Sequence, residues 1–222
     1  MFASSPPSPR GQRPPGQRIN RVVVAVIAAV LLLLVTGLWL YLYLGTLEKP
    51  YYELQGYRVA TQRSFDQFLR NRDHRAQYRE MEQFLRLNGV ADVTEVSNLL
   101  RQGSDWLEVG EPAFAFPPRE LWRNIIPTLV LMRDELVPVV GPVGVLSAYR
   151  TDSYNRKAGG APASKHRNFC GLDLVPRSNI SRAELADELR SLHARLGPGS
   201  DLGIGLYRGV RFHIDTCGYR RW

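Results

Sequence analysis

The longest apolar run of the chain lies close to its N-terminus. Residues 22–44, VVVAVIAAVLLLLVTGLWLYLYL, carry no charge, and a helix of this length matches the ~30 Å hydrocarbon core of a bilayer. A cleaved signal peptide would have an apolar region of roughly 7 to 15 residues followed by a small-residue cleavage site. Because this run is longer and no such site follows it, the pattern predicts a transmembrane helix from Val22 to Leu44 that stays attached.

The flanks of this run predict its orientation. Residues 1–21 are rich in Pro, Gly, Ser and Arg and contain no acidic residue, a composition typical of a disordered tail. Four arginines precede the run, whereas the segment GTLEKP after it is close to neutral. By the positive-inside rule, the tail is cytoplasmic and the chain from residue 45 onward lies across the membrane.

The first polar stretch beyond the membrane has helical periodicity. Apolar residues recur at helical spacing over residues 64–89, with Ser64 as the predicted start and Asn88-Gly89 as the end. We interpret residues 45–103 as a helical spacer that precedes a C-terminal domain over residues 104–222. The alternative is that this helix packs on the domain.

The remaining chain combines shorter helices with strands. Apolar periodicity predicts helices over 92–103, over 118–136 with a break at Pro127, and over 181–196. Capping boxes at the starts of the first and third of these support them. Strands are predicted in GPVGVLSAYR, in CGLDLVP, and on both sides of a turn at Arg208-Gly209. The pattern is that of an α+β fold in which helices flank a small antiparallel sheet.

Composition narrows the classes of function. At 222 residues and 44% hydrophobic, the chain can form one sizeable core in addition to the membrane helix. The net charge is +8, but four of the positive charges lie in the N-terminal tail, so the charge gives little support to a nucleic-acid partner. A Gly-Gly pair in TDSYNRKAGGAPA lacks the GK[ST] of a phosphate-binding loop. We therefore predict neither kind of site.

The candidate chemistry concentrates in the segment SKHRNFCGLD. It contains two potential metal ligands, His166 and Asp173, and the second lies in a predicted buried strand. A third, His213, lies in a later strand. Two imidazoles and a carboxylate, with a water in the fourth position, are the ligand set of an open catalytic zinc site. Of the four histidines, we expect His74 at the surface and His193 at the surface or half-packed.

The order of these motifs resembles a known family. The segments SAYRTDSYN, SKHRNFCGLD and GIGLYRGVRFHID, followed by GYRRW, are similar to the zinc D-Ala-D-Ala carboxypeptidase and murein endopeptidase family, with its SxHx(6)D and HxD patterns. The resemblance covers about residues 145–222. It implies that His166, Asp173 and His213 bind Zn2+ and that the chain hydrolyses amide bonds in peptidoglycan peptide stems. The expected location is then a bacterial inner membrane, with the C-terminal domain in the periplasm.

The resemblance also implies roles for two residues near the ligands. Arg150 is similar to the arginine that holds a substrate carboxylate in relatives, a task suited to a planar, permanently charged guanidinium. Ser164 resembles a serine that contacts the substrate. Zinc would polarise the scissile carbonyl and lower the pKa of its bound water toward ~7. The implied enzyme is a zinc-dependent peptidase.

Two positions depart from the family pattern. The family usually has a glycine three residues after the first histidine, where this chain has Phe169, and a glycine appears two residues later as Gly171. Several branches place a general base two or three residues before the last ligand, where this chain has Arg211 and Val210. Arginine cannot accept the proton. Beside a metal, Arg211 could instead stabilise an oxyanion.

Asp215 is the nearest replacement for a general base. Strand alternation places it on the same face as Arg211 and His213, and we take it as the candidate catalytic residue. Two other roles are open: a second carboxylate that orients a ligand imidazole, and an ordinary salt bridge with Arg211 or Arg220.

The two cysteines of the chain follow predicted ligands by four residues each, Cys170 after His166 and Cys217 after His213. Both therefore lie on segments that must converge on one metal, in a compartment expected to be oxidising. We predict a disulfide between them. Strand alternation places the two side chains on different faces, so a strand end or a bulge would have to reconcile them. Cysteine ligation of the zinc is the alternative.

Three classes of function remain. The first is a membrane-anchored zinc peptidase that acts on peptidoglycan stems. The second is a non-catalytic module of the same fold that binds zinc or murein, a reading favoured by Arg211 at a possible base position. The third is a structural protein in which the histidines are merely packed.

Overall fold

The computed structural model describes residues 20–46 and 49–222. The chain divides into two compact units, Met1–Glu48 and Lys49–Trp222, and each is described on its own. Of the predicted disordered tail, 1–21, all but the last two residues lie outside the described part.

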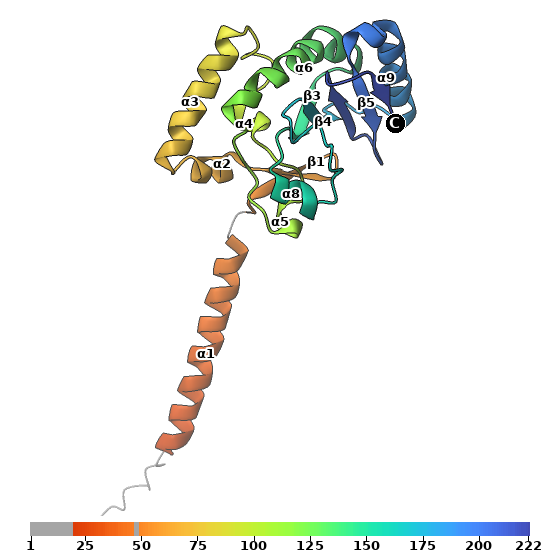
Figure 1. The fold of residues 1–222 in the computed structure, drawn as a ribbon. Helices are drawn as coiled ribbons and strands as arrows, with labels where there is room; N and C mark the ends of the chain where they lie inside the picture. The colour runs from red at the N-terminus through yellow and green to blue at the C-terminus, as the bar shows by residue number, and fades with distance from the viewer. Residues whose placement is uncertain (1–19, 47–48) are drawn as a thin grey trace, which may run out of the picture. The chain divides into compact units, whose positions relative to one another are not determined.

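The described part of the first unit is a single helix, α1, Arg21–Thr46 (Figure 1). Within it, Arg21–Leu44 is long and apolar enough to cross a membrane, and this stretch includes the predicted span 22–44. An apolar helix so close to the N-terminus fits either a membrane span or a signal sequence.

The second unit is built around a five-stranded sheet. Its strand order is β3-β4-β6-β5-β7, and all neighbours are antiparallel except β5 and β7, which are parallel. A separate two-stranded sheet pairs β1 with β2. The strands are β1 Tyr51–Leu54, β2 Tyr57–Ala60, β3 Val143–Ser147, β4 Gly171–Pro176, β5 Gly203–Leu206, β6 Phe212–Asp215 and β7 Arg220–Arg221. The predicted α+β class with a small antiparallel sheet is confirmed, and the parallel strand β7 is an addition.

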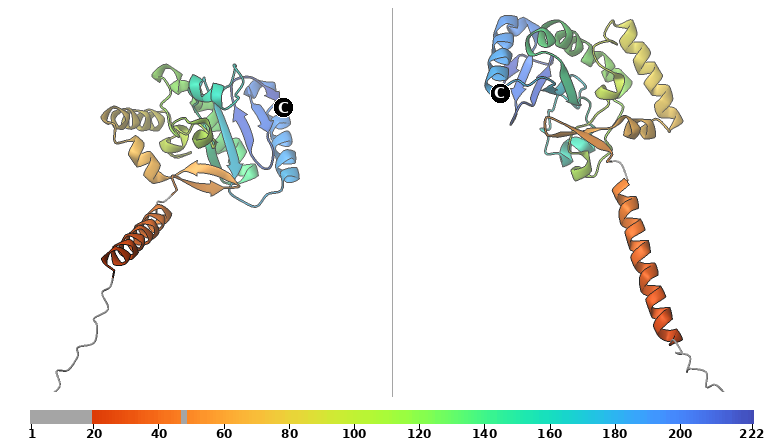
Figure 2. Two further views of the ribbon diagram at one scale, coloured as in Figure 1. Left: turned by 90° about the horizontal axis from the view of Figure 1, so that it is seen from below. Right: turned by 180° about the vertical axis from the view of Figure 1, so that it is seen from behind.

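Helices flank this sheet on more than one side. Figures 1 and 2 show α3 and α9 at opposite ends of the unit, with the sheet nearer α9. The helices after α1 are α2 Gln62–Phe68, α3 Arg72–Leu87, α4 Val96–Leu99, α5 Trp106–Val109, η1 Arg119–Ile125, α6 Ile126–Leu131, η2 Met132–Leu136, α7 Val137–Val140, α8 Asp152–Lys157, α9 Arg182–Leu196 and η3 Pro198–Ser200. The predicted capping box of Ser181 and Glu184 starts α9.

The helix predicted over 64–89 is broken into α2 and α3. Asn71 starts the second helix, because its side chain accepts a hydrogen bond from the backbone N–H of Asp73. Thr61, rather than Ser64, caps the first. Side-chain caps of this kind satisfy backbone donors that have no partner within the helix, so a new cap can end one helix and begin the next.

These two helices pack on the domain. Phe65 of α2 and Met81 and Leu85 of α3 belong to the same hydrophobic core as Leu172 of the sheet. Of the two interpretations of this region, a spacer or a helix packed on the domain, the structure therefore shows the second. The division at residue 103 into a spacer and a catalytic domain stays a prediction about function, since Lys49–Trp222 is one compact unit.

Two other predicted helices are shorter or less regular than expected. Within 92–103 only α4 is helical. The helix starts after Glu95, which forms no side-chain cap, so the predicted capping box of Asp92 and Glu95 is wrong. The stretch from 119 to 140 passes through 3-10, α, π and α geometry. Its first change comes at Ile126, next to Pro127, because a proline ring and its missing N–H interrupt regular helical bonding.

The two histidines outside the candidate site are less exposed than expected. His193 is 7% exposed and its ring stacks on that of Tyr219, with 4.0 Å between centroids. His74 is half-buried, and its Nδ1 lies 2.9 Å from the carbonyl oxygen of Phe68. Both side chains serve packing.

The packing of α3 can be tested with two leucines on that helix. Leu85→Ala should lower the free energy of unfolding by about 2–5 kcal/mol, the usual effect of truncating a buried leucine, because Leu85 is 1% exposed. Leu87→Ala is the control: that side chain is 79% exposed, so the change should stay within about 0.5 kcal/mol. Urea unfolding followed by tryptophan fluorescence measures both. Equal effects would show that α3 does not share the core.

Candidate metal centre

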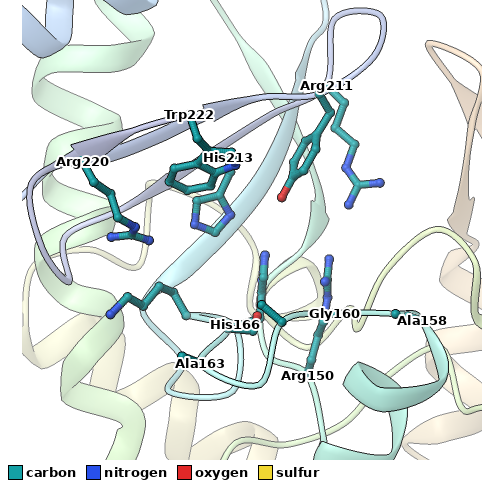
Figure 3. Close-up of a pocket in the computed structure, with 14 residues that line it drawn as sticks. Arg150, Ala158, Gly160, Ala163, His166, Arg211, His213, Arg220 and Trp222 are labelled. Atoms are coloured by element: carbon teal, nitrogen blue, oxygen red, sulfur yellow. The ribbon is translucent and has the colours of Figure 1, made fainter.

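Strand pairing brings two of the candidate ligands together. Asp173 on β4 lies directly opposite His213 on β6 in an antiparallel pair, so the two side chains leave the same face of the sheet. His166 lies in the loop before β4, and its carbonyl oxygen accepts a hydrogen bond of 3.2 Å from the backbone N–H of Arg150. Figure 3 shows His213 on the sheet side of the site and His166 with Arg150 on the other.

The three side chains converge on one oxygen atom. Asp173 Oδ1 lies 3.1 Å from His166 Nε2 and 3.0 Å from His213 Nδ1, and all three groups are buried. One donor atom from each residue lies within 4.8 Å of the others. Two imidazoles and a carboxylate at this separation are the donor set of a catalytic zinc site, so these residues fit the ion.

The far nitrogens of both imidazoles are held by hydrogen bonds. His166 Nδ1 lies 2.7 Å from the carbonyl oxygen of Ala148; because a carbonyl only accepts, this nitrogen carries the proton. His213 Nε2 lies 2.9 Å from Asp215 Oδ2. Such partners orient the ring and select the tautomer that presents its other nitrogen to a metal. His166 Nε2 and His213 Nδ1 are those nitrogens here.

Burial and charge set the protonation states of the ligands. Burial lowers the pKa of His166 to about 4, so its imidazole is neutral near pH 7. Burial alone would raise the pKa of Asp173, but interactions with His166, His213 and Arg150 hold it well below its usual range. Burial acts to lower the pKa of His213, and hydrogen bonds to Asp173 and Asp215 raise it instead. A metal that binds His213 therefore competes with a proton for this imidazole.

Asp215 supports His213 from the side away from the other ligands. Its carboxylate is fully buried, and its oxygens accept hydrogen bonds from His213 Nε2, from the backbone N–H of Cys217, and from both terminal nitrogens of Arg220. No exposed oxygen is left to take a proton from water. The position fits the predicted orienting role combined with an ion pair to Arg220, and it does not fit the predicted catalytic base.

A pocket of about 540 Å³ opens beside the ligands. The predicted substrate-binding residues Arg150 and Ser164 line it together with His166 and His213 (Figure 3). Arg150 also donates from Nη2 to Asp173 Oδ2 at 2.6 Å. The structure thus brings two predicted metal ligands and both predicted substrate-binding residues to one cavity, with the third ligand, Asp173, buried behind it.

The lining of this pocket is strongly basic. Four cationic side chains line it, Arg150, Lys165, Arg211 and Arg220, whereas the two acidic groups in contact with them, Asp173 and Asp215, are fully buried. Arg211 binds the same carboxylate oxygen of Asp173 as Arg150 does. A concave surface with this excess of positive charge attracts anionic groups.

Two aromatic residues of the pocket, Tyr207 and Trp222, were missed by the sequence reasoning. The Tyr207 hydroxyl lies 3.4 Å from Asp173 Oδ1, and burial raises its pKa to about 12, so the phenol stays protonated near neutral pH. The Trp222 ring centroid lies 5.3 Å from that of His213.

Alternation in GIGLY could have found Tyr207. Gly205 lies opposite His213 in the β5–β6 pair, so the second residue after it shares that face. Gly205 also leaves room for the Trp222 indole, because a Cβ at this position would lie 2.3 Å from it. Trp222 carries no such signal, because its place depends on the parallel pairing of β7.

Phe169 explains the first departure from the family pattern. Its φ of +53° lies in the left-handed region, which a glycine adopts freely and another residue adopts at roughly 1–2 kcal/mol. Its ring is fully buried and packs edge-on against Tyr149. The loop therefore keeps the backbone conformation that suits glycine, and burial of the aromatic ring offsets the strain.

Cys170 and Cys217 are joined by a disulfide. Cys170 immediately precedes β4 and Cys217 follows β6 by two residues, so both lie at strand ends, where alternation no longer sets their direction. The bond ties the segment of His166 to the segment of His213. Because the two sulfurs are bonded to each other, the alternative of cysteine ligation does not describe this structure.

Comparison with known protein families gives a match over part of the chain. Residues 119–215 match the model of the family described as Peptidase M15, a stretch that contains His166, Asp173 and His213 and ends before Arg220 and Trp222. No curated protein and no solved structure matches the chain. The family match confirms the resemblance carried by the sequence motifs.

The role of Asp215 can be tested by Asp215→Asn. Loss of an orienting carboxylate typically weakens metal affinity 10–100-fold, so competition with a chelating dye should show this loss for Zn2+. Asp152→Asn is the control, because Asp152 also pairs with an arginine, Arg167, but is exposed and outside the pocket; its Zn2+ affinity should equal that of the wild type. If Asp215→Asn instead keeps its Zn2+ affinity and loses turnover, the hypothesis that Asp215 is the catalytic base is supported.

Proposed function

We propose that the protein is a zinc-dependent peptidase that hydrolyses amide bonds in peptidoglycan peptide stems, because residues 119–215 match the Peptidase M15 family of zinc D-Ala-D-Ala carboxypeptidase-like peptidases. The observation that carries the proposal is the convergence of His166, Asp173 and His213 beside a basic pocket. That lining suits a peptide with free carboxylates.

Different residues would bind the ion, orient its ligands and hold the substrate. Zinc held by the three ligands would polarise the scissile carbonyl and make hydroxide available near neutral pH. Asp215 and the carbonyl oxygen of Ala148 keep the imidazoles in their metal-binding orientation. Arg150 and Arg211 fix the remaining oxygen of Asp173. Arg150 and Ser164, both in the pocket lining, hold the substrate.

Arg211 takes the place of a general base and performs a different task. Its guanidinium lies in the pocket and donates to Asp173, and it cannot accept a proton. A fixed positive charge at this point favours the negative charge that develops on the carbonyl oxygen during attack by water.

We place the peptidase on the outer side of a bacterial inner membrane, anchored by α1. The arginines before residue 22 support a cytoplasmic N-terminus, and the disulfide of Cys170 and Cys217 fits an oxidising compartment. Retention of the full-length chain in membranes washed with carbonate supports the anchor. If cells instead cleave off the first 44 residues and release the rest as a soluble chain, the anchor is contradicted.

A second candidate is a non-catalytic module of the same fold that binds zinc or murein. The specific observation in its favour is that Arg211 and Val210 stand where several branches of the family carry a base, while Asp215 is enclosed by its partners.

Product mapping on purified wall fragments separates the two candidates. Zinc-loaded full-length protein should release fragments from crosslinked or D-Ala-terminated stems, identified by mass spectrometry, and His166→Ala should reduce release at least ~10³-fold because a three-residue ligand set loses a member. His74→Gln, which alters an imidazole outside the pocket, is the control and should retain activity. Full zinc occupancy without turnover on any stem would favour the binding module, and protein without stoichiometric metal would contradict both.

A further inference from the structure

The Tyr207 hydroxyl is aimed at the atom on which the metal ligands converge. It lies 3.4 Å from Asp173 Oδ1, the oxygen that also contacts His166 Nε2 and His213 Nδ1. Within the described part of the chain, this oxygen is the hydroxyl's one hydrogen-bond partner. The distance is long for an O–H···O bond, so the hydroxyl is weakly engaged and faces the pocket.

Metal binding would change the partner of this hydroxyl. Asp173 Oδ1 is the oxygen that faces both ligand imidazoles, and an ion held among them would use its lone pair. The Tyr207 proton would then be available to a substrate group in the pocket. A phenol held against a site where negative charge develops has the donor chemistry of an oxyanion hole.

Three contacts fix the position of Tyr207. Its backbone N–H donates to the carbonyl oxygen of Arg211 at 3.0 Å, and its own carbonyl oxygen accepts from Arg182. The Arg211 guanidinium lies over the ring, 4.6 Å from its centroid, a cation–π contact that restrains the ring. A donor held in this way is pre-organised, because it needs no reorientation when the substrate reacts.

The guanidinium groups nearest the ligands each bind a buried carboxylate. Arg150 and Arg211 both bind Asp173 Oδ2, and Arg220 binds Asp215 through both terminal nitrogens. Tyr207 differs from them because it is a neutral donor next to the metal ligands, and its 3.4 Å contact with Asp173 Oδ1 leaves the hydroxyl able to bind another group.

We propose that Tyr207 is a catalytic residue, whose hydroxyl donates a hydrogen bond to the oxygen of the scissile carbonyl as that oxygen becomes negatively charged. Water adds its oxygen to the amide carbon, the C–N bond then breaks, and the leaving amine takes a proton that comes from the water. The phenol keeps its own proton throughout. The inference rests on the proposed peptidase function and assigns this site a donor for its transition state.

Tyr57 provides a matched control for the test. Its ring lies on the same guanidinium of Arg211, 5.8 Å from it, but its hydroxyl donates to the carbonyl oxygen of Arg208 at 3.1 Å and it does not line the pocket. Tyr57→Phe and Tyr207→Phe therefore each remove one phenol oxygen beside Arg211, and only the second removes one beside the metal ligands.

The test compares zinc-loaded full-length protein with both variants on the wall fragments described above. For Tyr207→Phe, kcat should fall about 10²–10³-fold, the usual effect of removing one oxyanion donor, with KM and zinc content unchanged. Its affinity for a phosphinic analogue of the cleaved peptide should fall by a similar factor, and its affinity for the reaction product should stay the same. Tyr57→Phe should match the wild type in all five measurements.

Other outcomes overturn the inference. Wild-type kcat in Tyr207→Phe, or loss of zinc together with activity, assigns Tyr207 a structural role. Equal losses in both variants show that each tyrosine acts by placing Arg211. A wild-type protein that turns over no fragment instead refutes the proposed function, and the inference falls with it.

Discussion

The buried carboxylate of Asp173 is the group on which the candidate site depends. A charge with no exposure to water is strongly unfavourable unless other groups compensate it, and here two imidazoles meet one oxygen while two guanidinium groups meet the other. The partners come from three parts of the fold: His166 from the loop before β4, Arg150 from the segment after β3, and Arg211 and His213 from the β5–β6 hairpin. The site is therefore complete only when these separate segments have come together.

Outer contacts hold these partners in place. The C-terminal strand β7 pairs with β5 and carries Arg220 to Asp215, which in turn orients His213. The disulfide of Cys170 and Cys217 joins the two ligand-bearing segments at the same end of the paired strands, next to Asp215. Together they limit the freedom of the ligands, so that a metal would meet a site that is already assembled.

Local sequence signals predicted the parts of the site that depend on strand pairing. The patterns of CGLDLVP and VRFHID placed Asp173 and His213 on strands, and the family resemblance joined them with His166 as a ligand set. The break between α2 and α3 was missed because the Asn71 cap competes with a continuous apolar stripe. The enclosure of Asp215 was missed because Arg220 reaches it only through the parallel pairing of β7, which no local pattern encodes.

The central claim is that two imidazoles and one carboxylate share a single zinc ion. Zinc K-edge X-ray absorption of the purified full-length protein tests it most directly, because light-atom ligands at about 2.0–2.2 Å and sulfur at about 2.3 Å are distinct. The account predicts a shell of nitrogen and oxygen only, with outer scattering from two imidazole rings. A sulfur shell, or a spectrum without imidazole scattering, would contradict it.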